Sequence, residues 1–185
     1  MFDIKRIEDS PLTNFIFNNP KVAPIWLPVR VYVGYIFLTA GFGKLQNEAW
    51  VGEKAGNALT GFISGALEKT AGAHPDVAMW YADFLQNIVL PNVVLWSGLV
   101  AWGEFLVGLA LILGLFTGIA AFFGLFMNFN FMLAGTLSSN PILFVLGVLL
   151  MLGWKVAGFW GLDRYALPLL GTPWQKGRMF KKWLD

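Results

Sequence analysis

The chain of 185 residues is too apolar for an ordinary soluble domain, because 57% of its residues are hydrophobic before its 21 glycines are counted and only 13% are charged. The lack of Cys excludes disulfides, thiolate metal sites and cysteine-ligated iron–sulfur clusters, and a single His excludes a zinc site or a haem held by histidines alone. We therefore expect no metal site and no intrinsic cofactor. The formal net charge of +2 is too small to indicate nucleic acid as a partner.

Four windows, taken in chain order, are long and apolar enough to cross a membrane: residues 22–45, 92–113, 117–136 and 140–161. A helix needs about 20 mostly apolar residues to cross the roughly 30 Å of hydrocarbon in a bilayer. The sequence therefore predicts an all-α, polytopic membrane protein, in which residues 1–185 form a single domain built on a bundle of four transmembrane helices. Short connections make the second, third and fourth spans antiparallel neighbours.

The segment between the first and second spans, residues 46–91, is too long for a plain loop. Apolar residues recur in it at helical spacing and predict two amphipathic helices. The first group is Ala55, Leu59, Phe62, Ile63, Ala66 and Leu67, and the second is Val77, Trp80, Tyr81, Phe84, Leu85 and Ile88. Neither helix is apolar enough to span, so we expect both to lie on the outer membrane surface or to cap the bundle.

Lysine and arginine residues outside the spans gather toward the two ends of the chain. Residues 1–21 and 162–185 are rich in them, whereas residues 46–91 hold only Lys54 and Lys69 beside a larger number of acidic residues. Because cytoplasmic segments carry an excess of Lys and Arg, we predict a plasma-membrane protein whose N-terminal segment and basic C-terminal tail are both cytoplasmic. Residues 1–21 lack the shape of a cleaved signal peptide, so we expect the first span to be retained.

Two ionisable residues, Arg30 and Glu104, lie well inside the predicted spans, where a charge costs at least about 2.5–3.5 kcal/mol. Both lie in the cytoplasmic half of their spans, at depths that match within the reach of an Arg side chain. We therefore predict that they form an ion pair. The pair either only fastens two helices together, or also lines a polar pocket that binds a head group or moves a proton.

Other polar residues extend this candidate site. Lys44 falls on the same stripe of the first span as Arg30, although it lies close enough to the boundary for its stem to carry the ammonium to the interface. Asn128 and Asn130 place two amides in the middle of the third span, where we expect them to turn inward, and Trp102 lies beside Glu104. The candidate ligand-binding residues are Arg30, Lys44, Trp102, Glu104, Asn128 and Asn130.

No sequence pattern identifies catalytic residues, because the chain has no P-loop, no HExxH and no GxSxG motif. Asp163 and Arg164 follow the fourth span, and we predict that they form an ion pair at the cytoplasmic interface. Whether turnover takes place in this chain is left open by the residues themselves.

Three stretches resemble successive spans of the DoxX family: RVYVGYIFLTAGFGKL, WGEFLVGLALILGLFTGIAAFFGLFMNFNFMLAGT and NPILFVLGVLLMLGWKVAGFWGLDR. The resemblance extends from about Val22 to Leu170. It rests on an Arg that opens the first span, AGxxK that closes it, WGE in the second and GLDR after the fourth. The resemblance implies a small four-span bundle in the plasma membrane.

Relatives in that family include the membrane subunit of a thiosulfate:quinone oxidoreductase. The resemblance therefore implies a membrane subunit of an oxidoreductase complex, in which Arg30, Glu104 and Asn128 hold the head group of an isoprenoid quinone. A soluble or membrane-bound partner would then supply the electron-carrying cofactor.

Two other functions stay open at this point. In a non-catalytic scaffold the buried charges only fasten the bundle, and the outer helices, with Trp80 and Tyr81, recruit another protein. A small-solute transporter ranks last, because four spans without an inverted repeat leave little room for alternating access unless the chain dimerises. Glycines in the spans are compatible with packing within one chain or in a homo-oligomer.

Overall fold

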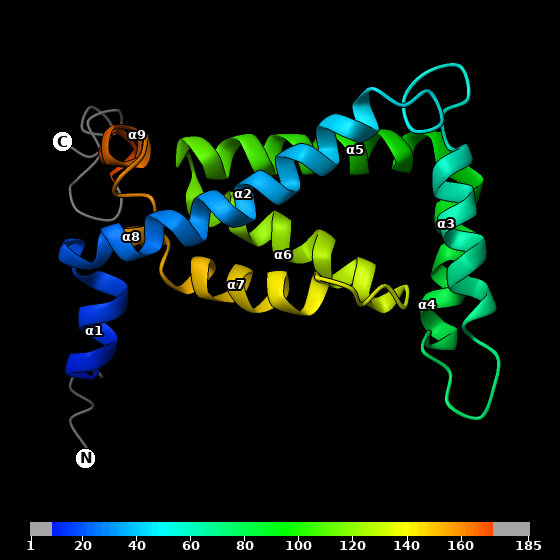
Figure 1. The fold of residues 1–185 in the computed structure, drawn as a ribbon, viewed down its shortest axis with the longest axis horizontal. Helices are drawn as coiled ribbons and strands as arrows, with labels where there is room; N and C mark the ends of the chain where they lie inside the picture. Colours follow the sequence, from blue (N-terminus) through cyan, green and yellow to red (C-terminus); the bar gives the residue numbers. More distant parts are fainter. Residues whose placement is uncertain (1–8, 172–185) are drawn as a thin grey trace, which may run out of the picture.

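The computed structural model describes residues 9–171, and this part of the chain is helical, with no strand. Four long helices run side by side along the long axis of the molecule (Figure 1). They are α2 (Ala23–Leu45), α5 (Val93–Leu113), α6 (Thr117–Leu133) and α7 (Asn140–Leu152). Each lies within one of the four apolar windows, and the chain alternates in direction from one helix to the next (Figure 1).

Shorter helices gather at the two ends of this bundle (Figure 1). Helices α3 (Asn57–Glu68) and α4 (Met79–Phe84) lie across one end, which we call the α3 end. Helices α1 (Pro11–Asn18), α8 (Trp154–Ala157) and α9 (Asp163–Leu170) lie at the opposite, α9 end. The short 3₁₀ helix η1 (Pro20–Val22) joins α1 to α2.

The second predicted amphipathic helix does not form a separate element. Helix α4 continues through a π turn, η2 (Leu85–Val89), and a 3₁₀ turn, η3 (Leu90–Asn92), into α5. Pro91 has no N–H to give to a helical hydrogen bond, and just before it the N–H of Leu90 reaches back five residues to the carbonyl of Leu85. The helix therefore changes direction at the α3 end without being interrupted.

Glycines bring α2 and α5 into close contact and fix how they align. A Cβ atom at Gly41 would collide with the backbone of Phe105, and one at Gly108 would collide with the backbone of Leu38. Helix α2 packs chiefly against α5, and α6 chiefly against α7. Small residues that allow backbones to approach are typical of helix pairs in membranes.

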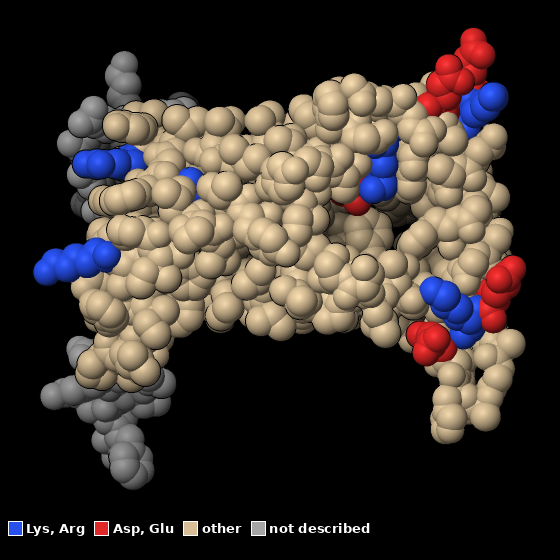
Figure 2. Space-filling view, in the orientation of Figure 1, with Lys and Arg blue, Asp and Glu red and all other residues tan. Residues whose placement is uncertain are grey.

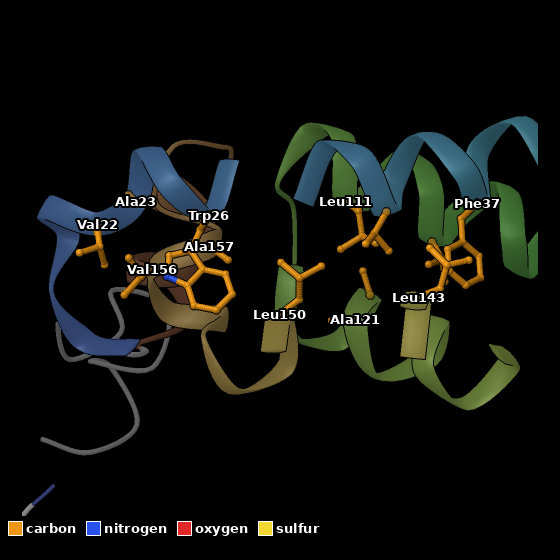
Figure 3. Packing of buried hydrophobic residues seen from close by; sticks show 13 residues of the cluster. Val22, Ala23, Trp26, Phe37, Leu111, Ala121, Leu143, Leu150, Val156 and Ala157 are labelled. Atoms are coloured by element: carbon orange, nitrogen blue, oxygen red, sulfur yellow. The ribbon is translucent and has the colours of Figure 1, made fainter. Parts of the chain in front are cut away.

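Two apolar clusters lie inside the molecule. The larger one extends along the bundle, where residues such as Phe37, Leu111, Leu143 and Leu150 point toward one another (Figure 3). The smaller cluster lies under α3 and α4, where Ile63 and Val77 are fully buried. Leu59, Ile63 and Ala66 of α3 are buried in this smaller cluster, so one face of α3 packs against the end of the bundle.

The outer surface of the bundle is also apolar. Residues on the outer faces of α5, α6 and α7 are more than half exposed, among them Leu99, Leu106, Ile119, Phe126, Ile142 and Val145. Within residues 9–171, two helical stretches, Pro20–Leu45 and Met79–Leu113, are long and apolar enough to cross a membrane, and α6 and α7 are shorter apolar helices. Such a surface is unfavourable in water and favourable in lipid.

Candidate functional site

A pocket of about 330 Å³ lies between α2, α6 and α7, beneath α3. Figure 2 shows a hollow near the α3 end, with blue and red side chains beside it. Its walls include the apolar or aromatic side chains of Ile36, Phe37, Trp50, Phe62, Phe131 and Leu143. Its polar lining includes Lys44, Glu104, Asn128 and Asn140, and we call this site the charged pocket.

Lys44 and Glu104 form an ion pair in the charged pocket. The ammonium nitrogen of Lys44 donates to Oε2 of Glu104 at 2.6 Å, and the two side chains are 21% and 4% exposed. The contact follows from the packing at Gly41, which brings the end of α2 against the middle of α5. Lys44 Nζ also lies 5.1 Å from the centre of the Trp50 ring, so the cation contacts a carboxylate and an aromatic face.

Asn128 and Asn140 form a second polar contact in this pocket. Nδ2 of Asn140 donates to the carbonyl of Thr136 at 2.8 Å, which turns Oδ1 of Asn140 toward Asn128. Nδ2 of Asn128 donates to that oxygen at 3.0 Å. Oδ1 of Asn128 is then left as an acceptor, and no donor among the described residues reaches it although it is buried.

The structure corrects the predicted pairing of Arg30 with Glu104. The prediction assumed that the first two spans begin and end at the same level. The glycine contacts instead place Gly41 beside Phe105, and Arg30 reaches Gly114, the residue that ends α5. Because the start of α2 extends beyond the end of α5, Arg30 lies at the α9 end and Glu104 finds Lys44.

Arg30 fastens the α9 end of the bundle. Its guanidinium donates to the carbonyls of Ala157 and Trp160 at 2.9 and 3.0 Å, and its side chain is buried. Asp163 attracts Arg30 electrostatically. The same carboxylate accepts hydrogen bonds from the backbone N–H groups of Phe116 and Thr117 at 2.6 and 2.9 Å, which caps the start of α6. These contacts join α2, α6 and the segment from α8 to α9.

The predicted interfacial pair of Asp163 and Arg164 is also corrected. Asp163 is fully buried, and its carboxylate accepts hydrogen bonds from backbone N–H groups at the N-terminus of α6. Arg164 instead lies over the ring of Phe159, with 5.2 Å between its guanidinium carbon and the ring centre.

Asn130 and Trp102 do not line the charged pocket. The amide of Asn130 donates to the carbonyl of Phe126 at 2.8 Å, and the hydroxyl of Tyr81 donates to its side chain and its backbone carbonyl at 3.2 and 3.0 Å. Asn130 therefore ties α6 to α4. Trp102 is 51% exposed on the outer face of α5, edge-on to Phe105.

Trp50 and Asn140 belong to the pocket, and sequence reasoning missed both. Asn128 and Asn140 are equally distant from position 134, where the chain turns between two antiparallel helices. Residues placed in this way lie at the same level of the two helices, so the spacing could have indicated their contact. Trp50 lies in the connection after α2, where no helical periodicity indicates which way a side chain faces.

A second pocket, of about 430 Å³, lies at the α9 end. Its walls are almost entirely apolar and include Phe116, Phe122, Met151 and Trp154, and Thr117 is a polar lining residue. This second pocket holds no ionisable lining residue, in contrast to the charged pocket.

Comparison with known proteins places the chain in a family. The family model DoxX matches residues 25–137, which cover most of α2 and all of α3, α4, α5 and α6. The chain belongs to the DoxX family. No curated protein and no solved structure gives a significant match. As a member of the DoxX family, this chain is a membrane protein. Its candidate site is inferred from the pocket and the contacts described above.

The charged pocket of this DoxX-family chain combines three chemical properties. An ammonium and a carboxylate in contact can exchange or hold a proton, the Asn128 oxygen can accept a hydrogen bond, and the aromatic walls suit a flat ring. In residues 9–171 no group of three His, Asp or Glu side chains is placed to hold a metal ion.

Proposed function

We propose that this DoxX-family chain is the membrane subunit of an oxidoreductase complex and that it holds the head group of a quinone in the charged pocket. The main support is the contact of Lys44 with Glu104, beside Asn128, within apolar walls. Ionisable residues inside a membrane are costly, and such residues commonly mark ligand sites or proton paths. Arg30, which the sequence placed in this site, has a structural role instead.

The fit of a quinone rests on shape and on polar groups. A quinone head group is a flat ring with apolar faces and oxygen atoms at its edge, so it matches aromatic walls with a few polar residues. The volume of about 330 Å³ is near the lower end for ligand pockets, which suits one ring whose isoprenoid tail stays in the lipid. Reduction of a quinone takes up electrons and protons in equal number. A partner with a redox cofactor would supply the two electrons, and Lys44 and Glu104 would pass protons taken up from water to the ring oxygens.

We further propose that α2, α5, α6 and α7 each span the plasma membrane, with the α9 end cytoplasmic. The described basic residues at that end include Lys21, Lys155 and Arg164, whereas at the α3 end acidic residues outnumber lysines. Figure 2 shows this difference between the two ends. Most basic residues of the predicted cytoplasmic segments lie in residues 1–8 and 172–185, outside the described part of the chain. The charge asymmetry supports the proposed orientation.

The test is organic extraction of the protein, purified gently in detergent, with mass spectrometry of the bound quinone. The informative variant replaces both members of the pair, Lys44→Met with Glu104→Leu, because removing only one would leave a buried charge without a partner. Replacing both with apolar residues of similar volume is often neutral for stability. We expect the double variant to fold and to lose the quinone.

Lys155→Met is the matched control, since it removes a lysine at the opposite end of the bundle that donates to the side chain of Asn18. It should retain quinone as the wild type does. A wild-type protein without quinone, or a double variant that keeps it, would contradict the proposal. Those results would favour a scaffold, in which exposed apolar residues of α4 such as Met79 and Trp80 contact a partner.

A further inference from the structure

The orientation of the Asn128 amide is fixed by its neighbours. Thr136 offers a carbonyl oxygen, which can only accept, so Asn140 must turn its NH₂ group toward it. The remaining oxygen of Asn140 accepts from Asn128, which must therefore present its own NH₂ group. This relay of two hydrogen bonds fixes the orientation of the Asn128 amide. Its Oδ1 therefore remains an acceptor and cannot exchange places with the NH₂ group.

Asn128 lines the charged pocket, and among the described residues no donor reaches its Oδ1. Asn128 is 1% exposed, lines the pocket and receives no hydrogen bond at Oδ1 from the described residues. A buried polar atom without a partner costs free energy that a ligand can recover by donating a hydrogen bond. Glu104 contributes a carboxylate, which is also an acceptor when ionised.

We propose that Asn128 makes the charged pocket selective for a ring that bears a free hydroxyl group, so that the quinol is bound more tightly than the quinone. This inference rests on the proposed function and adds the redox form of the ligand and the residue that distinguishes it. A quinol hydroxyl donates to Asn128 Oδ1. A quinone carbonyl at the same place would put two acceptor oxygens against each other, because the Asn140 relay prevents the amide from turning over.

The experiment compares three probes by calorimetric titration in detergent: a short-chain alkyl 1,4-naphthoquinone, its quinol, and the dimethyl ether of that quinol. The ether keeps the ring and removes both hydroxyl hydrogens. For the wild type we expect the quinol to bind at least about tenfold more tightly than either other probe, which corresponds to about 1.4 kcal/mol. Asn128→Leu should reduce that preference to less than about threefold.

Asn130→Leu is the matched control, since this asparagine lies on the same helix but outside the pocket, and it should keep the preference. Asn140→Ala is a second test that leaves Asn128 in place. Without its relay partner the Asn128 amide can turn over, so the preference should shrink while binding persists. This variant decides the question if Asn128→Leu does not fold.

Each other outcome has a defined meaning. Equal binding of the three probes would overturn the role of Asn128 and leave the proposed function standing. A quinol preference that survives in both Asn128→Leu and Asn140→Ala would also overturn it. Binding of none of the probes would contradict the proposed function itself.

Discussion

Arg30 and Lys44 occupy the same stripe of α2, and each is held at a different end of the bundle. Arg30 donates hydrogen bonds to two backbone carbonyls, which suits the planar guanidinium with its several fixed N–H groups. Lys44 contacts one carboxylate and the face of one aromatic ring, which suits a compact ammonium on a flexible stem. Of the two cations on α2, Arg30 is therefore a structural residue and Lys44 is a candidate ligand-binding residue.

Arg30→Met should destabilise the protein without acting directly on the charged pocket. The carbonyls of Ala157 and Trp160 would lose their donors and Asp163 would lose a nearby cation. Leaving a buried backbone carbonyl without its donor costs about 1–3 kcal/mol for each group. The thermal unfolding midpoint in detergent should fall clearly, while protein that remains folded should still bind quinone. An unchanged midpoint together with loss of quinone would contradict the structural role.

At the scale of helices, the contact between α2 and α5 determines which polar residues meet. Gly41 and Gly108 are placed where any larger residue would strike the backbone of the other helix. This contact aligns Lys44 with Glu104 and carries Arg30 past the end of α5. The composition of the charged pocket is thus a consequence of two glycines outside it.

Gly41→Ala should separate α2 from α5 and lower stability by about 1–3 kcal/mol, the usual cost of overpacking. Gly43→Ala is the natural comparison, because a Cβ there meets no atom within 4 Å and alanine favours a helix over glycine by about 1 kcal/mol. The unfolding midpoints in detergent should therefore move in opposite directions. Equal effects of the two changes would show that the contact at Gly41 is not close.

The helices themselves could be predicted from the sequence, but their alignment could not. The limits of α2 and α5 follow from apolar windows bounded by polar residues, and the apolar spacing of residues 55–67 predicts α3. The residue that pairs with Glu104 depends on how far α2 is shifted along α5, and two long apolar helices can pack in several such registers. Only the close contacts at Gly34, Gly41 and Gly108 select one of them.

At the scale of the whole molecule, the proposed orientation can be tested with introduced thiols. The chain has no Cys, so a single new cysteine is the only thiol to label. Ser64 on α3 and Ser10 before α1 are both exposed and lie at opposite ends of the bundle. A membrane-impermeant maleimide should label Ser64→Cys in intact cells and Ser10→Cys only after the membrane is opened. Labelling of Ser10→Cys in intact cells would contradict a cytoplasmic N-terminal segment.

The two pockets lie at opposite ends of the bundle, so the position of a bound quinone distinguishes them. The most direct measurement is photolabelling of the purified protein with an azido-substituted benzoquinone, followed by mass-spectrometric mapping of the modified peptides. Binding in the charged pocket predicts label on peptides that contain Trp50, Phe62 or Phe131, with competition by unlabelled quinone. Label confined to peptides that contain Phe116 or Trp154, or label that unlabelled quinone does not displace, would contradict the assignment of the charged pocket.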